Sequence, residues 1–181
     1  MRNKPQRKNK KKIQKKTILI VGEGLHEYVF IQHLRSIIIP ISSISITPKR
    51  GNGGSPVDIV YIAVKDVGSY DIRVVILDNY RPEAEMQAAE AEAAQSAVFL
   101  IKNKPCLEAL LLAMLEKGKD YSNHSEVQCK KIFQAKYIPE GRRSELLHYK
   151  KHFPLKLLDQ RRKDIAVLER IMRLLEKGEI D

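Results

Sequence analysis

The sequence has no tryptophan, few other aromatic residues and only two cysteines. Phe and Tyr make up 6% of its 181 residues, which disfavours a surface that stacks nucleic-acid bases on a broad aromatic platform. Cys106 and Cys129 are too few for a disulfide framework or a four-cysteine zinc site, so we expect both to be reduced and buried. No apolar run approaches the roughly 20 residues that cross a bilayer, and the basic start lacks the apolar core of a secretory signal. These absences predict a cytoplasmic protein that does not span a membrane.

Positive charge is concentrated at the N-terminus. The first 16 residues contain nine Lys and Arg and no acid, which leaves 24 of the 33 Lys and Arg to balance all 22 Asp and Glu elsewhere. A run of like charges with little apolar surface cannot form a core, so residues 1–16 are predicted to be a disordered basic tail. Such a tail suits sequence-independent binding to DNA or RNA phosphates through Lys10, Lys11, Lys12, Lys15 and Lys16. The alternative is a solvated leader without a specific partner.

After the tail, strand and helix patterns alternate. Short apolar, β-branched runs predict strands over residues 17–21, 43–47, 72–77 and 96–101. Helical spacing, bounded by Pro and Gly, predicts helices over residues 26–38, 56–67, 82–95 and 105–117. This order is typical of an α/β domain, here residues 17–118, in which a mostly parallel four-stranded sheet is covered by helices on both faces.

The last third of the chain has a different pattern. Residues 125–137 and 157–177 are predicted to be helical, and a stretch rich in Arg, Lys and His, residues 142–156, separates them. Arg142 and Arg143 in this stretch are candidates for a second phosphate-binding surface, although a plain charged exterior is the alternative. We expect residues 119–181 to be a helical extension that packs on the α/β domain.

Acidic residues follow two of the predicted strands. Glu23 comes just after the first strand and Asp78 just after the third. Parallel strands place their carboxyl ends at one edge of the sheet, where open α/β sheets bind ligands. Grouped carboxylates suit Mg²⁺ or Mn²⁺, which nucleases use to activate water. Two isolated surface carboxylates at strand ends are the alternative.

Three segments resemble a known family. The run ILIVGEGLHEYVFIQHL (residues 18–34) resembles the opening of TOPRIM-fold proteins of the RloB-like group and of the related OLD-type nucleases. GNGGSPVDI (51–59) with YDIRVVILD (70–78) resembles the glycine-bearing loop, helix and strand that end in Asp-x-Asp. NKPCLEALLL (103–112) resembles the Asn-Pro-Cys-Phe-Glu segment of that group. The resemblance implies a TOPRIM-like fold and a metal-dependent endonuclease in bacterial anti-phage defence, for which an ATPase or another defence protein is a candidate partner.

The resemblance also implies roles for individual residues. Glu23, Asp78 and Glu108 match the catalytic positions, and Glu23, Glu27 and Asp78 match those that hold Mg²⁺ or Mn²⁺. In one departure from the family, Tyr80 stands where the second aspartate of Asp-x-Asp is expected. A tyrosine cannot replace that carboxylate on Mg²⁺ at neutral pH, so metal binding is predicted to be weak. A catalytically degenerate module that binds nucleic acid or a partner is therefore the alternative function.

Overall fold

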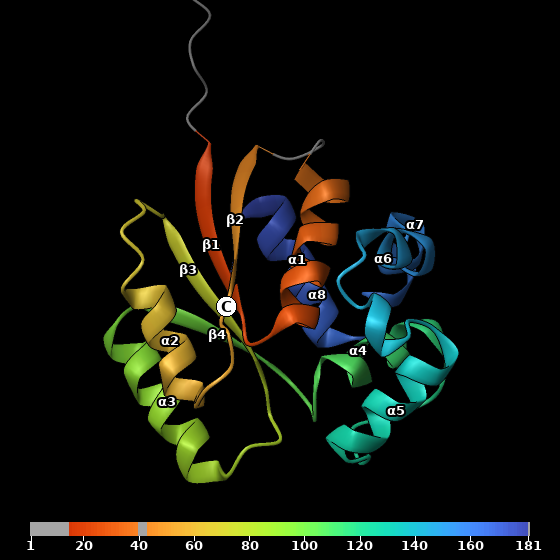
Figure 1. Ribbon diagram of the computed structural model, residues 1–181. Coiled ribbons are helices and arrows are strands. Elements are labelled where there is room, and N and C mark those ends of the chain that lie inside the picture. Colours follow the sequence, from red (N-terminus) through yellow and green to blue (C-terminus); the bar gives the residue numbers. More distant parts are fainter. Residues whose placement is uncertain (1–14, 40–42, 181) are drawn as a thin grey trace, which may run out of the picture.

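The computed structural model describes residues 15–39 and 43–180, so the predictions for Lys10, Lys11 and Lys12 lie outside the described residues. Four parallel strands form one sheet in the order β2-β1-β3-β4 (Figure 1). The strands are β1 (Lys16–Gly22), β2 (Ile44–Arg50), β3 (Ile72–Asp78) and β4 (Val98–Asn103). Helices connect them: α1 (Leu25–Ile38), α2 (Pro56–Val64) and α3 (Glu83–Gln95). The α/β architecture predicted from the sequence, which is Rossmann-like, is confirmed.

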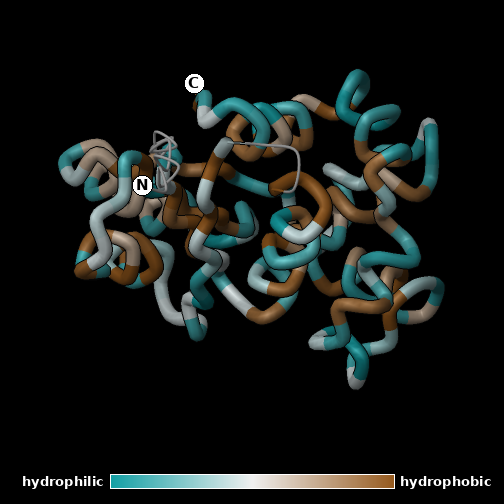
Figure 2. Tube along the Cα trace, turned by 90° about the horizontal axis from the view of Figure 1, so that it is seen from above, coloured by the Kyte–Doolittle hydropathy of each residue, from teal (hydrophilic) through white to brown (hydrophobic). Residues whose placement is uncertain are grey.

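Helices cover both faces of the sheet. Alternate residues of β1 point to opposite sides because side chains in a strand alternate. Ile18 and Ile20 pack in the hydrophobic cluster that contains α1, whereas Leu19 and Val21 pack in a second cluster with α2 and α3. Figure 1 shows α2 and α3 together on one side of the sheet, and Figure 2 shows hydrophobic residues along the strands between them and the helices opposite.

The chain after β4 is helical and lies on the α1 side. It contains α4 (Leu107–Leu115), α5 (Glu126–Lys136), the 3₁₀ turn η2 (Glu140–Arg142), α6 (Leu146–His152), α7 (Leu155–Arg161) and α8 (Ala166–Lys177). Phe133, Tyr149 and Leu168 from these helices belong to the same hydrophobic cluster as Ile18 of β1. The extension thus shares one core with the sheet. None of the helices in the described part of the chain is long and apolar enough to cross a membrane.

The prediction of one continuous helix over residues 157–177 is wrong. The chain forms α7, then a short turn, then α8. The turn closes because the backbone N–H groups of Asp164 and Ile165 both donate to the carbonyl of Arg161, at 3.0 and 3.1 Å. Ile165 then has an extended backbone and stands at the N-terminus of α8. The apolar spacing continues across the break, so periodicity alone could not reveal it.

A polar network around Glu116 fastens the extension. This carboxylate accepts hydrogen bonds from the side chains of Lys119 (2.6 Å), Tyr121 (2.7 Å), Lys136 (2.9 Å) and Tyr137 (3.0 Å). These hydrogen bonds, led by the one from Lys119, hold the pKa of Glu116 well below its usual range. The network joins the end of α4 to the end of α5.

We expect Glu116→Gln to lower the free energy of unfolding by about 2 kcal/mol at neutral pH, because hydrogen bonds to charged groups are lost. A lowered pKa stabilises the fold above the ordinary carboxyl pKa, and that contribution disappears as pH falls through the folded-state value. The difference between wild type and variant should therefore shrink in acid. Chemical denaturation at several pH values measures it. Glu90→Gln, which breaks an exposed ion pair with Lys102, is the control and should change stability by less than about 1 kcal/mol.

Candidate active site at the carboxyl edge of the sheet

Glu23 and Asp78 meet where the strand order of the sheet reverses. From β1 the chain proceeds to β2 on one side, and β3 and β4 lie on the other, so β1 and β3 flank the switch point at which α/β sheets bind ligands. The backbone N–H of Glu23 donates to the carbonyl of Ile76 at 3.2 Å, and that of Asp78 donates to Glu23 Oε2 at 3.1 Å. The two acidic residues are thus fixed against each other by the pairing of adjacent strands.

Glu27 reaches the same place from the first turn of α1. Its Oε2 accepts a hydrogen bond from the backbone N–H of Gly24 at 2.8 Å, which caps the helix. The helix comes very close to the end of β1, since a Cβ on Gly22 would lie 2.4 Å from the Cβ of Glu27. Only glycine fits at position 22, and its small size brings Glu27 to the edge of the sheet.

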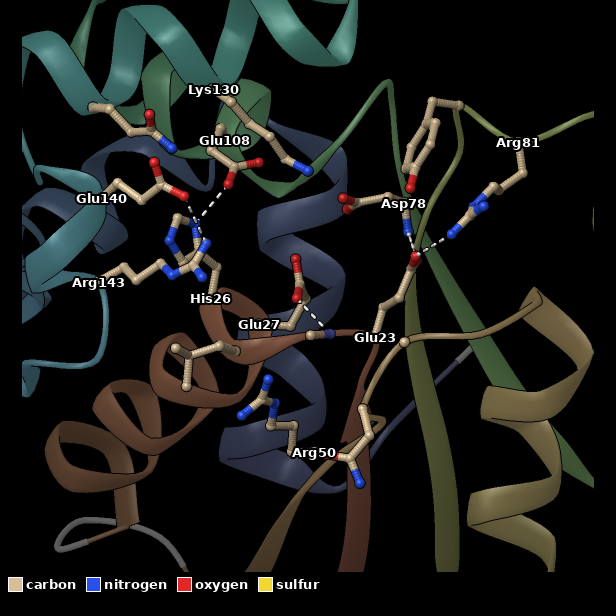
Figure 3. Close-up of a pocket in the computed structure, with 16 residues that line it drawn as sticks. Glu23, His26, Glu27, Arg50, Asp78, Arg81, Glu108, Lys130, Glu140 and Arg143 are labelled. Atoms are coloured by element: carbon tan, nitrogen blue, oxygen red, sulfur yellow. Dashed lines mark hydrogen bonds and ion pairs between the residues drawn. The ribbon is translucent and has the colours of Figure 1, made fainter.

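Glu108 enters from the first turn of α4. Its Oε1 lies 2.6 Å from Nδ1 of His26, which is the second residue of α1. The backbone N–H of Leu107, also in the first turn of α4, donates to Asp78 Oδ1 at 2.8 Å. The N-terminus of α4 therefore holds Asp78 directly and is joined to α1 through Glu108. Figure 3 shows Glu23, Glu27, Asp78 and Glu108 around a common space.

The four carboxylates are mostly buried, with exposed fractions of 9% for Glu23, 5% for Glu27 and Asp78, and 2% for Glu108. Burial and the charge of Glu108 raise the pKa of Glu27. Burial and the negative charges of Glu27, Glu108 and Glu23 raise the pKa of Asp78 well above its usual range. Burial acts in the same direction on Glu108, but the hydrogen bond from His26 and nearby positive charge outweigh it and lower the pKa of Glu108. The cluster is thus under mutual repulsion that a cation would relieve.

The carboxylates lie in a pocket of about 500 Å³. The residues around them include cationic side chains from widely separated parts of the chain: Arg50, Arg81, Lys130 and Arg143. Arg81 lies 3.6 Å from Glu23 Oε1 and donates to the carbonyl of Gly54 at 3.4 Å. Lys130 comes from α5 and forms an ion pair with Glu126. An acidic floor with a basic margin suits a phosphate ester that is bound together with a metal ion.

The residues best placed to share one metal ion differ from the set expected from the sequence. In the described part of the chain, ligand atoms of Asp78, Cys106 and Glu108 all lie within 4.8 Å of one another. Oε2 of Glu108 is buried without a hydrogen-bond partner, which leaves it free to bind an ion. Burial raises the pKa of the Cys106 thiol, and sulfur is a soft ligand that Mg²⁺ and Mn²⁺ disfavour. Oxygen ligands from Asp78 and Glu108 fit Mg²⁺ or Mn²⁺.

Two expected ligands are engaged elsewhere. Glu27 uses one oxygen to cap α1, and Glu23 binds the backbone of Asp78 and faces Arg81. They lie around the pocket but outside the group of atoms close enough to share one ion. Their negative charge still acts on Asp78.

The basic residues predicted to bind nucleic acid are separated. Arg143 lines the pocket, and Arg142 is exposed in η2. Lys15 is exposed and lies just before β1. Lys16 is the first residue of β1, so its placement in a disordered tail is wrong: its Nζ donates to the carbonyl of Gly178 at 2.6 Å. Because β1 starts there, Lys15 and Lys16 lie at the opposite edge of the sheet from the carboxylates.

Sequence reasoning did not select His26, Arg50, Arg81, Cys106 or Lys130 as site residues. Arg81 and Cys106 are near a selected acidic residue in sequence, so proximity was a usable signal. Lys130 lies on an extension helix and carried no such signal.

No protein-family model, curated protein or solved structure matches this chain.

Proposed function

We propose that this protein is a TOPRIM-type endonuclease that cleaves nucleic-acid phosphodiester bonds with Mg²⁺ or Mn²⁺ and serves in bacterial anti-phage defence. The observation that carries the proposal is the group of four buried carboxylates at the switch point of a parallel sheet, inside a pocket with cationic side chains at its margin. The proposal is also supported by the glutamate after β1 and the aspartate at the end of β3, to which the resemblance to RloB-like proteins gives catalytic roles.

Each group of residues has a task in this proposal. Asp78 and Glu108 supply oxygen ligands, and the bound ion would activate water and stabilise the leaving oxygen. Arg50, Arg81 and Arg143 line the same pocket and offer positive charge to the phosphates of the strand. Glu23 fixes the backbone of Asp78 through the hydrogen bond from its N–H.

A catalytically degenerate nucleic-acid- or partner-binding module is the second candidate. Tyr80 lines the pocket where the family has an acid, and Glu23 is engaged by Arg81 and by the backbone of Asp78. In such a module the cluster would keep its structure, and the cationic margin would still bind phosphate.

A cleavage assay separates the two candidates. The full chain is incubated with plasmid, single-stranded DNA and tRNA in Mg²⁺, in Mn²⁺ and in EDTA. The nuclease predicts products on at least one substrate that require the divalent ion. Binding to a substrate without products in either metal would favour the module.

The metal-free protein should lose stability as pH rises. A carboxyl group whose pKa is raised by folding stabilises the protein fully below its ordinary pKa of about 4, and that contribution is lost as pH rises through the raised value. Asp78 and Glu27 both have raised pKa values. Mg²⁺ at ten times its Kd should restore about 1.4 kcal/mol near pH 8 and much less near pH 5, where protons compete. Thermal unfolding with Mg²⁺ and with EDTA tests this, and equal shifts at both pH values would contradict it.

A further inference from the structure

The burial of the carboxylates and the size of the pocket restrict which substrates can reach them. The four acidic side chains are at most 9% exposed, and the cavity above them measures about 500 Å³, an ordinary size for a small-molecule site. One wall includes the start of α1 with Arg50, Asn52 and Gly53. The other includes Lys130 and Gln134 of α5 with Glu140 and Arg143 at η2. A duplex is wider than such a space, so an unpaired strand can bring a phosphate closer to the buried acids than a duplex can.

One aromatic ring stands at this pocket. Tyr80 follows β3 by two residues, lines the cavity and is 38% exposed. The guanidinium of Arg81 lies 4.9 Å from the centre of its ring, and Nζ of Lys130 lies 5.8 Å from it. The two cations lie over the ring and offer positive charge to phosphates, and the part of the ring that is exposed offers a surface for an adjoining base.

We propose that the substrate of the nuclease is an unpaired DNA or RNA strand, one nucleotide of which enters the pocket with its base against Tyr80 and its phosphates beside Arg81 and Lys130. This inference rests on the proposed function and assigns its substrate class. It also assigns a role to Tyr80, which stands where the second aspartate of Asp-x-Asp is expected. A single ring at the pocket suffices for one base, so the shortage of aromatic residues elsewhere does not oppose it.

The test measures binding in EDTA, so that cleavage plays no part. A short oligonucleotide that contains 2-aminopurine is offered to the full chain as single-stranded DNA, as single-stranded RNA and as a duplex. The salt concentration is roughly 0.3 M, which weakens sequence-independent binding through the many Lys and Arg of residues 1–16. Anisotropy reports affinity, and quenching of 2-aminopurine reports stacking.

The variants are Tyr80→Ala, Tyr80→Phe and the control Tyr61→Ala. Tyr61 is also 38% exposed and has Lys65 beside its ring at 5.3 Å, but it lies on α2 and does not line the pocket. We expect a single strand, DNA or RNA, to bind more tightly than the duplex. Tyr80→Ala should weaken that binding about tenfold and remove the quenching, whereas Tyr80→Phe should keep both. Tyr61→Ala should behave as wild type.

Two results would overturn the inference: a duplex that binds as tightly as the single strands, or a Tyr80→Ala protein that is indistinguishable from Tyr61→Ala. Circular dichroism of each variant checks that it is folded. The binding test contains no metal, so its outcome does not depend on cleavage. Failure of the separate cleavage assay would count against the nuclease alone. Binding that does not depend on Tyr80 would count against the unpaired-strand substrate alone.

Discussion

Asp78→Asn should abolish metal-dependent cleavage without weakening the fold. The amide keeps the shape of the side chain and can still accept the hydrogen bond from Leu107, but it removes a charge that a divalent ion needs. Loss of metal-assisted stabilisation amounts to several kcal/mol, so the cleavage rate should fall by about 10²–10⁴-fold. In EDTA at neutral pH the variant should be at least as stable as wild type, because it relieves repulsion among buried carboxylates.

The matched control is Glu85→Gln. Glu85 is an exposed acid in the first turn of α3, only seven residues further along the chain, and it does not line the pocket. The Glu85→Gln protein should cleave nucleic acid at the wild-type rate. Single-turnover cleavage and thermal unfolding in EDTA give the two measurements. An Asp78→Asn protein that cleaves normally, or one that is destabilised by several kcal/mol in EDTA, would contradict the role given to this aspartate.

Phe133→Ala should destabilise the protein by about 3–5 kcal/mol, the usual cost of removing a large buried aromatic side chain. Phe133 lies on α5, is fully buried and belongs to the cluster shared with the sheet. Its ring centroid is 5.9 Å from that of Tyr137. The same helix carries Lys130 and Gln134 on the wall of the pocket. If α5 loosens, binding of a nucleic-acid strand should weaken as well.

Val127→Ala is the control on the same helix. Val127 is 72% exposed, and its truncation should change the free energy of unfolding by no more than about 0.5 kcal/mol. Urea denaturation measures both variants. A loss below about 1 kcal/mol in Phe133→Ala would mean that α5 is not anchored by this residue and that the extension contributes little to the shared core.

The α/β architecture could be read from the sequence because its signals are local. The apolar run of β3 is buried on both faces, as is typical of a central parallel strand. Ser55 is the N-cap of the helix that begins at Pro56, and its side chain accepts a hydrogen bond from the N–H of Asp58. Strand ends and helix starts of this kind also indicated Glu23 and Asp78 as neighbours, because parallel strands share one carboxyl edge.

Other features depend on contacts between distant residues, and only the tertiary structure decided them. The break between α7 and α8 lies inside an unbroken apolar pattern and is made by backbone hydrogen bonds to Arg161. The pairing of His26 with Glu108 joins residues 82 positions apart. Side-chain hydrogen bonds also decide which acids can share an ion. Glu27, for example, uses one carboxylate oxygen to cap its own helix.

The sequence by itself determined the order of strands and helices and the edge of the sheet at which Glu23 and Asp78 gather, because hydrophobic periodicity and end signals act over a few residues. The tertiary structure decided which cations complete the pocket. Lys130 and Arg143 reach it only because the extension folds back onto α1 and α4 and closes a wall opposite the glycine-bearing loop. Packing of this kind depends on the combined shape of many side chains, and no short stretch of sequence records it.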